Sequence, residues 1–186
     1  MSRKLFAALT LLFSLALTQL VGVPAATAAP VPETQQVRTL YYDSSRAAEF
    51  RDAMDEGARI WNESVSNVRL ERGSPASITI IADNGWPRAQ VRRLGSGTIW
   101  MGRLAVNQGH DEIRIAAHEF GHLLGLPDRR TGLCQDLMSG ASAGTSCTNP
   151  YPNRAERAEV ERNFGGWRPA ESFRGFFPER EPAGAR

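Results

Sequence analysis

The strongest constraint on the fold is a pair of histidines, His118 and His122, four residues apart in a segment with helical periodicity. At about 100° per residue, the two side chains lie about 40° apart and project from one helix face. Ala116, Phe120 and Leu124 point about 160° to 240° away from His118. The segment must therefore form a helix that packs through one face and leaves both imidazoles on the other.

Two imidazoles at this spacing can bind a single Zn²⁺ at about 2.1 Å. Glu119 falls between the two helix faces, where it can accept a proton from a zinc-bound water without binding the ion itself. The alternative is that the three polar residues only cover an exposed helix face.

A catalytic zinc site needs a third protein ligand beside its water. A helix that continued past His122 would carry the next side chains away from the metal, whereas Gly125 permits a left-handed backbone that turns the chain back. Asp128 then becomes the third ligand. His110 precedes His118 by about 12 Å of axial rise if the chain is helical there, which is too far to share the metal.

The N-terminal residues have the pattern of a secretory signal peptide. Basic residues precede the apolar run Leu5–Val23, and small residues follow at 26–28. A membrane anchor is the alternative, but polar residues interrupt the run and a cleavage-like site follows it. We therefore expect a signal peptide over 1–28, a short pro-segment or stub over 29–36, a secreted protein, and no stable membrane association after cleavage.

Charge argues against a nucleic-acid partner. The chain has 22 basic and 20 acidic residues, and two of the basic residues lie in the leader, which leaves 20 of each sign. Nucleic-acid binders concentrate basic residues on one face, whereas here the two signs alternate along the chain. The length of 186 residues, 41% of them hydrophobic, suits one domain, expected over 37–167, which we expect to be monomeric. Residues 168–186 are expected to form a flexible tail.

The hydrophobic pattern predicts strands and helices in alternation. A helix-start signal at 43–45 precedes an amphipathic stripe, and a second helix begins at Asp111 and ends at Gly125. A last helix has Asn153 as its N-cap, with Glu156 three residues later, and ends after Phe164. The expected strands are 37–42, 68–71, 77–82 and 97–102.

Cys134 and Cys147 enclose a loop rich in Gly and Ser. In an oxidising compartment they are expected to form a disulfide. The alternative is that both are thiolate zinc ligands, but structural zinc sites prefer closely spaced cysteine pairs.

The extended motif, with Gly125 after the second histidine and a ligand three residues later, resembles the zinc motif of the metzincin metalloproteases. Asp128 in place of a third histidine is similar to the snapalysins, small secreted bacterial neutral proteases. The stretch 134–140 looks like their Met-turn, which would place Met138 beneath the zinc. The resemblance covers Val37–Phe164.

The resemblance implies an α+β zincin fold with a small twisted mixed sheet, an active-site helix, a backing helix and a C-terminal helix. It implies endopeptidase activity on proteins or peptides, with a leaning toward Tyr or Phe just after the cut bond. It also implies that Thr98–Met101 is the edge strand to which a peptide adds. A calcium site would take the Asp111 side chain and the Ile113 carbonyl; the alternative is that Asp111 caps the helix.

The sequence departs from the family pattern in several places. Gly140 stands where some metzincins have a tyrosine that helps to stabilise the oxyanion. The basic pair Arg129 and Arg130 directly follows Asp128, and the sequence assigns it no role. Residues 29–36 contain no cysteine, so latency through a thiolate on the zinc is excluded.

Two other functions compete with a metzincin-type endopeptidase. One is a zincin whose third ligand is a downstream glutamate such as Glu156. The other is a secreted, catalytically silent zinc-containing binding module.

Overall fold

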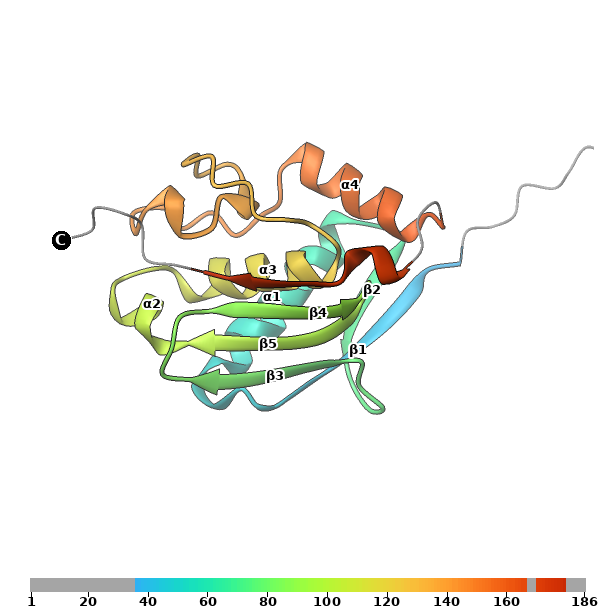
Figure 1. Ribbon diagram of the computed structural model, residues 1–186, viewed down its shortest axis with the longest axis horizontal. Helices are drawn as coiled ribbons and strands as arrows, with labels where there is room; N and C mark the ends of the chain where they lie inside the picture. The colour runs from blue at the N-terminus through green and yellow to red at the C-terminus, as the bar shows by residue number, and fades with distance from the viewer. Residues whose placement is uncertain (1–35, 167–169, 180–186) are drawn as a thin grey trace, which may run out of the picture. The chain divides into compact units, whose positions relative to one another are not determined.

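A six-stranded mixed sheet forms the framework of the computed structural model, which describes residues 36–166 and 170–179 (Figure 1). The strand order is β2-β1-β3-β5-β4-β6, with β1, β2, β3 and β5 parallel and β4 antiparallel to both of its neighbours. The strands are β1 (Arg38–Arg46), β2 (Val68–Arg72), β3 (Ile78–Asp83), β4 (Arg88–Arg93), β5 (Ser96–Gly102) and β6 (Gly175–Pro178). The expected signal peptide lies outside the described residues.

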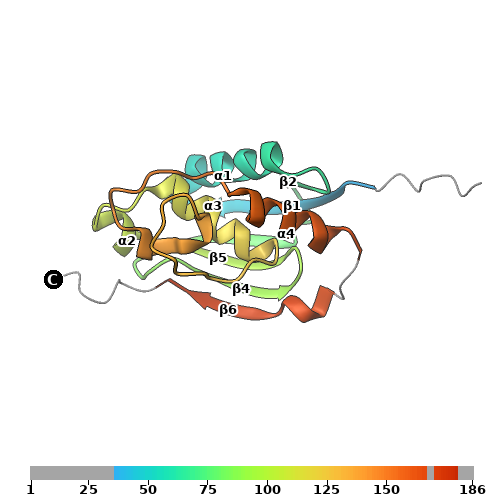
Figure 2. The ribbon, with the colours of Figure 1, turned by 90° about the horizontal axis from the view of Figure 1, so that it is seen from above.

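Two long helices, α1 and α3, pack against each other as well as against the sheet (Figure 2). They approach closely because Gly57 has no side chain: a Cβ there would lie 2.9 Å from the Ala117 nitrogen. Trp61 Nε1 donates to the Ala117 carbonyl at 2.8 Å. The helices are α1 (Arg51–Ser64), α2 (Arg103–Asn107), α3 (Glu112–Leu123) and α4 (Arg154–Phe164), with short 3₁₀ helices η1 (Ala48–Phe50), η2 (Leu137–Ala143) and η3 (Ala170–Phe173). The expected α+β class is confirmed.

The ends of α3 and α4 lie where local sequence signals predict them. Asp111 caps α3 by accepting from the Arg114 nitrogen at 2.8 Å, and the chain turns at Gly125 with a φ of 92°. Asn153 and Glu156 form the predicted capping box at the start of α4. These signals act within a few residues, which is why the sequence alone reveals them.

Two expectations about the other elements are wrong. The helix-start signal at 43–45 lies inside β1, and α1 begins only at Arg51. Thr98–Met101 is not an edge strand, because β5 is paired with β3 on one side and with β4 on the other. β4 was not among the expected strands, because Ala89 and Val91 are its only apolar residues.

The predicted disulfide between Cys134 and Cys147 is present, and the alternative of two thiolate ligands is wrong. The bridge spans a sequence separation of 13. In the chain-entropy view, closing a loop of this size stabilises the fold by about 3 kcal/mol. It fixes the loop that contains η2.

The C-terminal region differs from the flexible tail that we expected. Residues 170–179 form η3 and β6, and β6 pairs antiparallel with β4, with Ala89 opposite Phe177. Phe173 is buried and Phe177 packs against the core. The backbone groups of β4 and this apolar surface explain why the segment docks. Within the described ranges, no helix has the length and apolar composition needed to cross a membrane.

Candidate metal centre

Helix α3 places three polar side chains in the protein interior. His118, Glu119 and His122 are at most 2% exposed, although the first and last project from the polar face of the helix. The loop that contains η2 and the C-terminal strand cover that face. Buried polar groups of this kind require partners.

The outer nitrogens of both histidines have backbone partners. His118 Nδ1 lies 3.0 Å from the Leu137 carbonyl oxygen, and His122 Nδ1 lies 2.8 Å from that of Leu126. Because a carbonyl can only accept, each Nδ1 carries a proton, and each Nε2 faces the space between the rings. Both imidazoles are therefore oriented to bind a metal through Nε2.

Asp128 completes a cluster of three residues that could hold a metal ion. Its Oδ1 lies 3.3 Å from His118 Nε2 and 3.6 Å from His122 Nε2, and the two Nε2 atoms are 3.1 Å apart. Ligand atoms bound tetrahedrally to one zinc at 2.0–2.1 Å lie about 3.3 Å from one another. The turn at Gly125, with the Leu126 nitrogen bonded to the Gly121 carbonyl at 3.0 Å, brings Asp128 back to the helix.

Buried oxygen atoms around this cluster have no hydrogen-bond donor among the described residues. They are Asp128 Oδ1, both carboxylate oxygens of Glu119 and Oε1 of Glu179. Leaving such atoms without a partner is costly, so each one calls for an explanation. A cation bound by Asp128, with a water held by Glu119, satisfies this requirement, and the residues fit a zinc ion.

The electrostatics of the cluster favour a positive charge at its centre. Although burial opposes it, the carboxylates of Glu179 and Asp128 hold the pKa of His118 well above its ordinary value, so a bound cation would take the place of the proton on Nε2. Burial, together with the neighbouring His118, lowers the pKa of His122 to about 3, which keeps this imidazole neutral. Burial raises the pKa of Glu119 well above its ordinary value, and the nearby carboxylates of Glu179 and Asp128 add to the effect against the opposing influence of His118. A carboxylate with a raised pKa is a more effective proton acceptor.

The loop beneath the cluster is held by Glu156. Its carboxylate accepts from the nitrogens of Met138 at 2.8 Å and Leu137 at 3.2 Å. Glu156 therefore stabilises the loop and does not belong to the cluster that could hold a metal. Met138 is fully buried, and its sulfur packs against Gly121, which places it under the helix between the two histidines.

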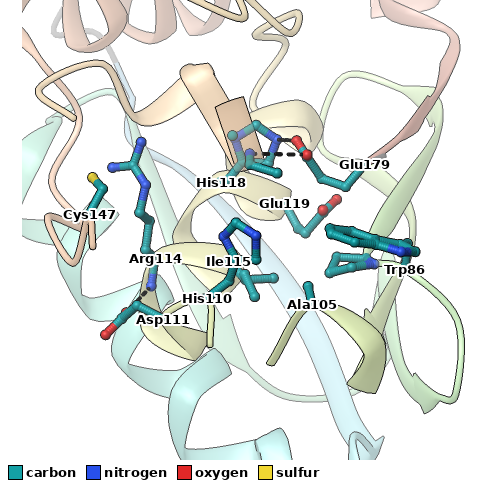
Figure 3. A pocket seen from close by; sticks show the side chains of 13 residues that line it. Trp86, Ala105, His110, Asp111, Arg114, Ile115, His118, Glu119, Cys147 and Glu179 are labelled. Carbon is teal, nitrogen blue, oxygen red and sulfur yellow. Dashed lines mark hydrogen bonds and ion pairs between the residues drawn. The ribbon is translucent and has the colours of Figure 1, made fainter. Parts of the chain in front are cut away.

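Arg130, to which the sequence assigns no role, connects two carboxylates of the site. Its Nη2 donates to Asp128 Oδ2 at 3.0 Å, and its Nη1 donates to Glu179 Oε2 at 2.7 Å. Arg129 instead pairs with Glu159. Sequence reasoning missed Glu179, whose Oε1 lies 2.9 Å from His118 Nε2 (Figure 3). Local spacing contains no signal for it.

The expected calcium site finds no support among the described residues. The Asp111 carboxylate has the alternative role of the helix cap, with Oδ1 bonded to the Arg114 nitrogen. Ile113 lies in the first turn of α3.

A pocket opens next to Glu119, at the N-terminal end of α3 (Figure 3). Its walls combine apolar side chains with polar ones, which are His110, Asp111, Arg114, His118, Glu119 and Glu179. The apolar lining residues include Trp86, Pro87, Ala105, Ile115 and Ala141.

Comparison with known proteins is consistent with this site. Residues 37–166 match the Streptomyces extracellular neutral proteinase (M7) family. The chain is 44% identical over 124 residues to the extracellular small neutral protease of Streptomyces caespitosus, covering 66% of this chain and 93% of that protein.

Two further relatives have the same name. The protein of Streptomyces lividans is 42% identical over 134 residues, covering 70% of this chain, and that of Streptomyces coelicolor is 45% identical over 127 residues, covering 67%. The chain spans only 59% and 58% of the length of these two relatives.

Proposed function

The chain belongs to the Streptomyces extracellular neutral proteinase (M7) family, and on that premise we propose that it is a secreted zinc-dependent metalloendopeptidase that cuts proteins or peptides. The observation that carries the proposal is the convergence of His118, His122 and Asp128 beside the buried Glu119. This arrangement supports the metzincin-type site inferred from the sequence, with Met138 beneath it.

In the proposed mechanism, His118, His122 and Asp128 hold the metal. When bound, Zn²⁺ supplies a Lewis acid for the scissile carbonyl and lowers the pKa of a water. The Glu119 carboxylate accepts a proton from that water and delivers it to the leaving amine nitrogen. Arg130 orients Asp128 through Oδ2, so that Oδ1 faces His118 Nε2, where it would hold the metal.

Metal removal distinguishes this function from a silent binding module. A zinc chelator is expected to lower casein hydrolysis at least about 10²-fold, and added Zn²⁺ should restore it, because both the Lewis acid and the acidified water are lost with the ion. Hydrolysis is measured by release of soluble peptides. If the wild type and Glu179→Ala each bind one zinc per chain but cut no peptide, the protein is instead a catalytically silent binding module.

We also propose that the pocket beside Glu119 receives the side chain that follows the cut bond, with Tyr or Phe favoured. Its apolar walls next to the proton acceptor support this placement, and Glu179 lines the same pocket. The free volume is about 20 Å³, room for about one water, so an aromatic side chain would enter only after Glu179 has left. The comparison is therefore made in the Glu179→Ala background. Ala141→Leu narrows the pocket, so kcat/KM for Tyr or Phe at this position should fall at least about tenfold. A matched peptide with Ala at the same position is the control. Equal losses for both peptides would contradict the assignment.

A further inference from the structure

The C-terminal strand β6 occupies the edge of β4. It runs antiparallel, with Arg88 opposite Pro178 and Val91 opposite Gly175. Without β6, β4 would be an edge strand of the described sheet, and an exposed strand edge is the surface to which an extended peptide adds. The residues of β6 therefore occupy the place that a peptide substrate would take.

The same segment covers both histidines of the metal centre. The Phe177 ring stacks on His122, with centroids 4.3 Å apart and planes 10° apart. Two residues later, Glu179 Oε1 lies 2.9 Å from His118 Nε2 (Figure 3). The Glu179 nitrogen also donates to the Pro87 carbonyl at 2.9 Å, which extends the strand pairing beyond Pro178.

The position of the Glu179 carboxylate is specified by several groups. The side chain is only 5% exposed, and its Oε2 accepts from Arg130 Nη1 at 2.7 Å and from the Ala141 nitrogen at 3.2 Å. Gly140 makes room for it, because a Cβ there would overlap Oε1. The remaining oxygen, Oε1, is buried, and its one polar partner among the described residues is His118 Nε2 at 2.9 Å. It faces His118 Nε2 at the margin of the cluster of His118, His122 and Asp128, from where it could reach an ion bound there.

We propose that Glu179 is an additional carboxylate ligand of the metal and that residues 175–179 block the substrate groove until they are displaced or removed. The inference rests on the proposed protease function. Carboxylate oxygens bind zinc as histidine nitrogens do, and a fourth protein ligand closes the position that a catalytic site keeps open for water. A side-chain carboxylate, not a peptide carbonyl, faces His118, so the segment is not itself positioned for cleavage.

The test compares the full-length wild-type chain with Glu179→Ala and Glu179→Gln, each loaded with one Co²⁺ per chain. Glu71→Ala is the matched control, because Glu71 is an exposed glutamate on β2, at the opposite edge of the sheet. Loss of a carboxylate ligand should change the visible absorption spectrum of the cobalt in both Glu179 variants and leave the control unchanged. Thermal unfolding verifies that each variant is folded.

Two further measurements address the blocking role. The backbone amides of Phe177 and Glu179, on the side of the segment that faces β4, should be protected from hydrogen exchange in the wild type and lose that protection in Glu179→Ala. Because the ligand and the Arg130 contact are lost together, kcat/KM for a peptide should rise at least about tenfold.

The outcomes separate this inference from the proposed function. An unchanged cobalt spectrum in Glu179→Ala overturns the ligand assignment. If the wild type is active and Glu179→Ala has the same kcat/KM or a lower one, the blocking role is overturned. If the cobalt spectrum and the hydrogen exchange both change, but neither the wild type nor Glu179→Ala cuts any peptide, residues 175–179 do occupy the groove and the proposed protease function is wrong.

Discussion

Glu119→Gln is expected to lower kcat for peptide hydrolysis by about 10²- to 10⁴-fold while leaving one zinc bound per chain. The substitution preserves the size of the side chain but removes the group that accepts the proton from water and returns it to the leaving amine. All three proposed ligands stay in place. The measurements are steady-state kinetics on a quenched peptide and metal content by mass spectrometry.

Glu112→Gln provides the control for Glu119→Gln. Glu112 is an exposed glutamate in the first turn of the same helix, so its substitution should change neither kcat nor metal content. If residues 175–179 suppress wild-type turnover, the same comparison is made in the Glu179→Ala background. Near-normal turnover of a zinc-loaded Glu119→Gln protein would contradict the role of Glu119 as the proton acceptor.

The sequence predicts the metal cluster because the signals for it are local. Helical periodicity places His118 and His122 on one face, and a single glycine reverses the chain so that Asp128 returns to them. The same holds for the N-caps of α3 and α4. Each of these inferences needs only geometry that is fixed within a few residues.

The parts that could not be predicted depend on contacts between distant segments. β4 has only two apolar residues, so its sequence carries a weak strand signal, and its pairing with β5 and β6 is what identifies it as a strand. Arg130 donates a hydrogen bond to Glu179, which lies 49 residues further along the chain. No periodicity or spacing connects such residues, so pairing at the sheet edge has to be seen in the structure.

Another long-range contact links the disulfide loop to the metal site. Arg114 is buried on α3, and its guanidinium donates to the Cys134 carbonyl at 3.2 Å and the Asp136 carbonyl at 2.8 Å. The next residue, Leu137, accepts from His118 Nδ1. The loop therefore orients a proposed metal ligand through its backbone, which explains why a segment with little regular structure is held by a disulfide and a buried cation.

Asp128→Ala is expected to weaken zinc binding at least about 10²-fold and to abolish hydrolysis, because a direct ligand should matter more than the outer groups whose loss costs 10- to 100-fold. Asp128 Oδ1 is the carboxylate of the three-residue cluster, and the substitution is made in the Glu179→Ala background, where the two histidines alone would leave the ion undercoordinated. Zinc affinity is measured by competition with a chromogenic chelator. Asp128→His is expected to retain more zinc than Asp128→Ala, since imidazole can also act as the third ligand.

His110→Ala is the control for metal content. His110 lines the pocket, where its ring centroid lies 5.9 Å from that of Trp86. It lies outside the cluster that could hold a metal, so its loss should leave zinc affinity unchanged.

Glu156→Ala tests the competing ligand. The Glu156 carboxylate braces the backbone at Met138, so its removal should lower the thermal stability of the zinc-free protein, an effect that a ligand role does not predict. Wild-type zinc affinity in Asp128→Ala, together with lost affinity in His110→Ala or Glu156→Ala, would show that the ligand set is wrong.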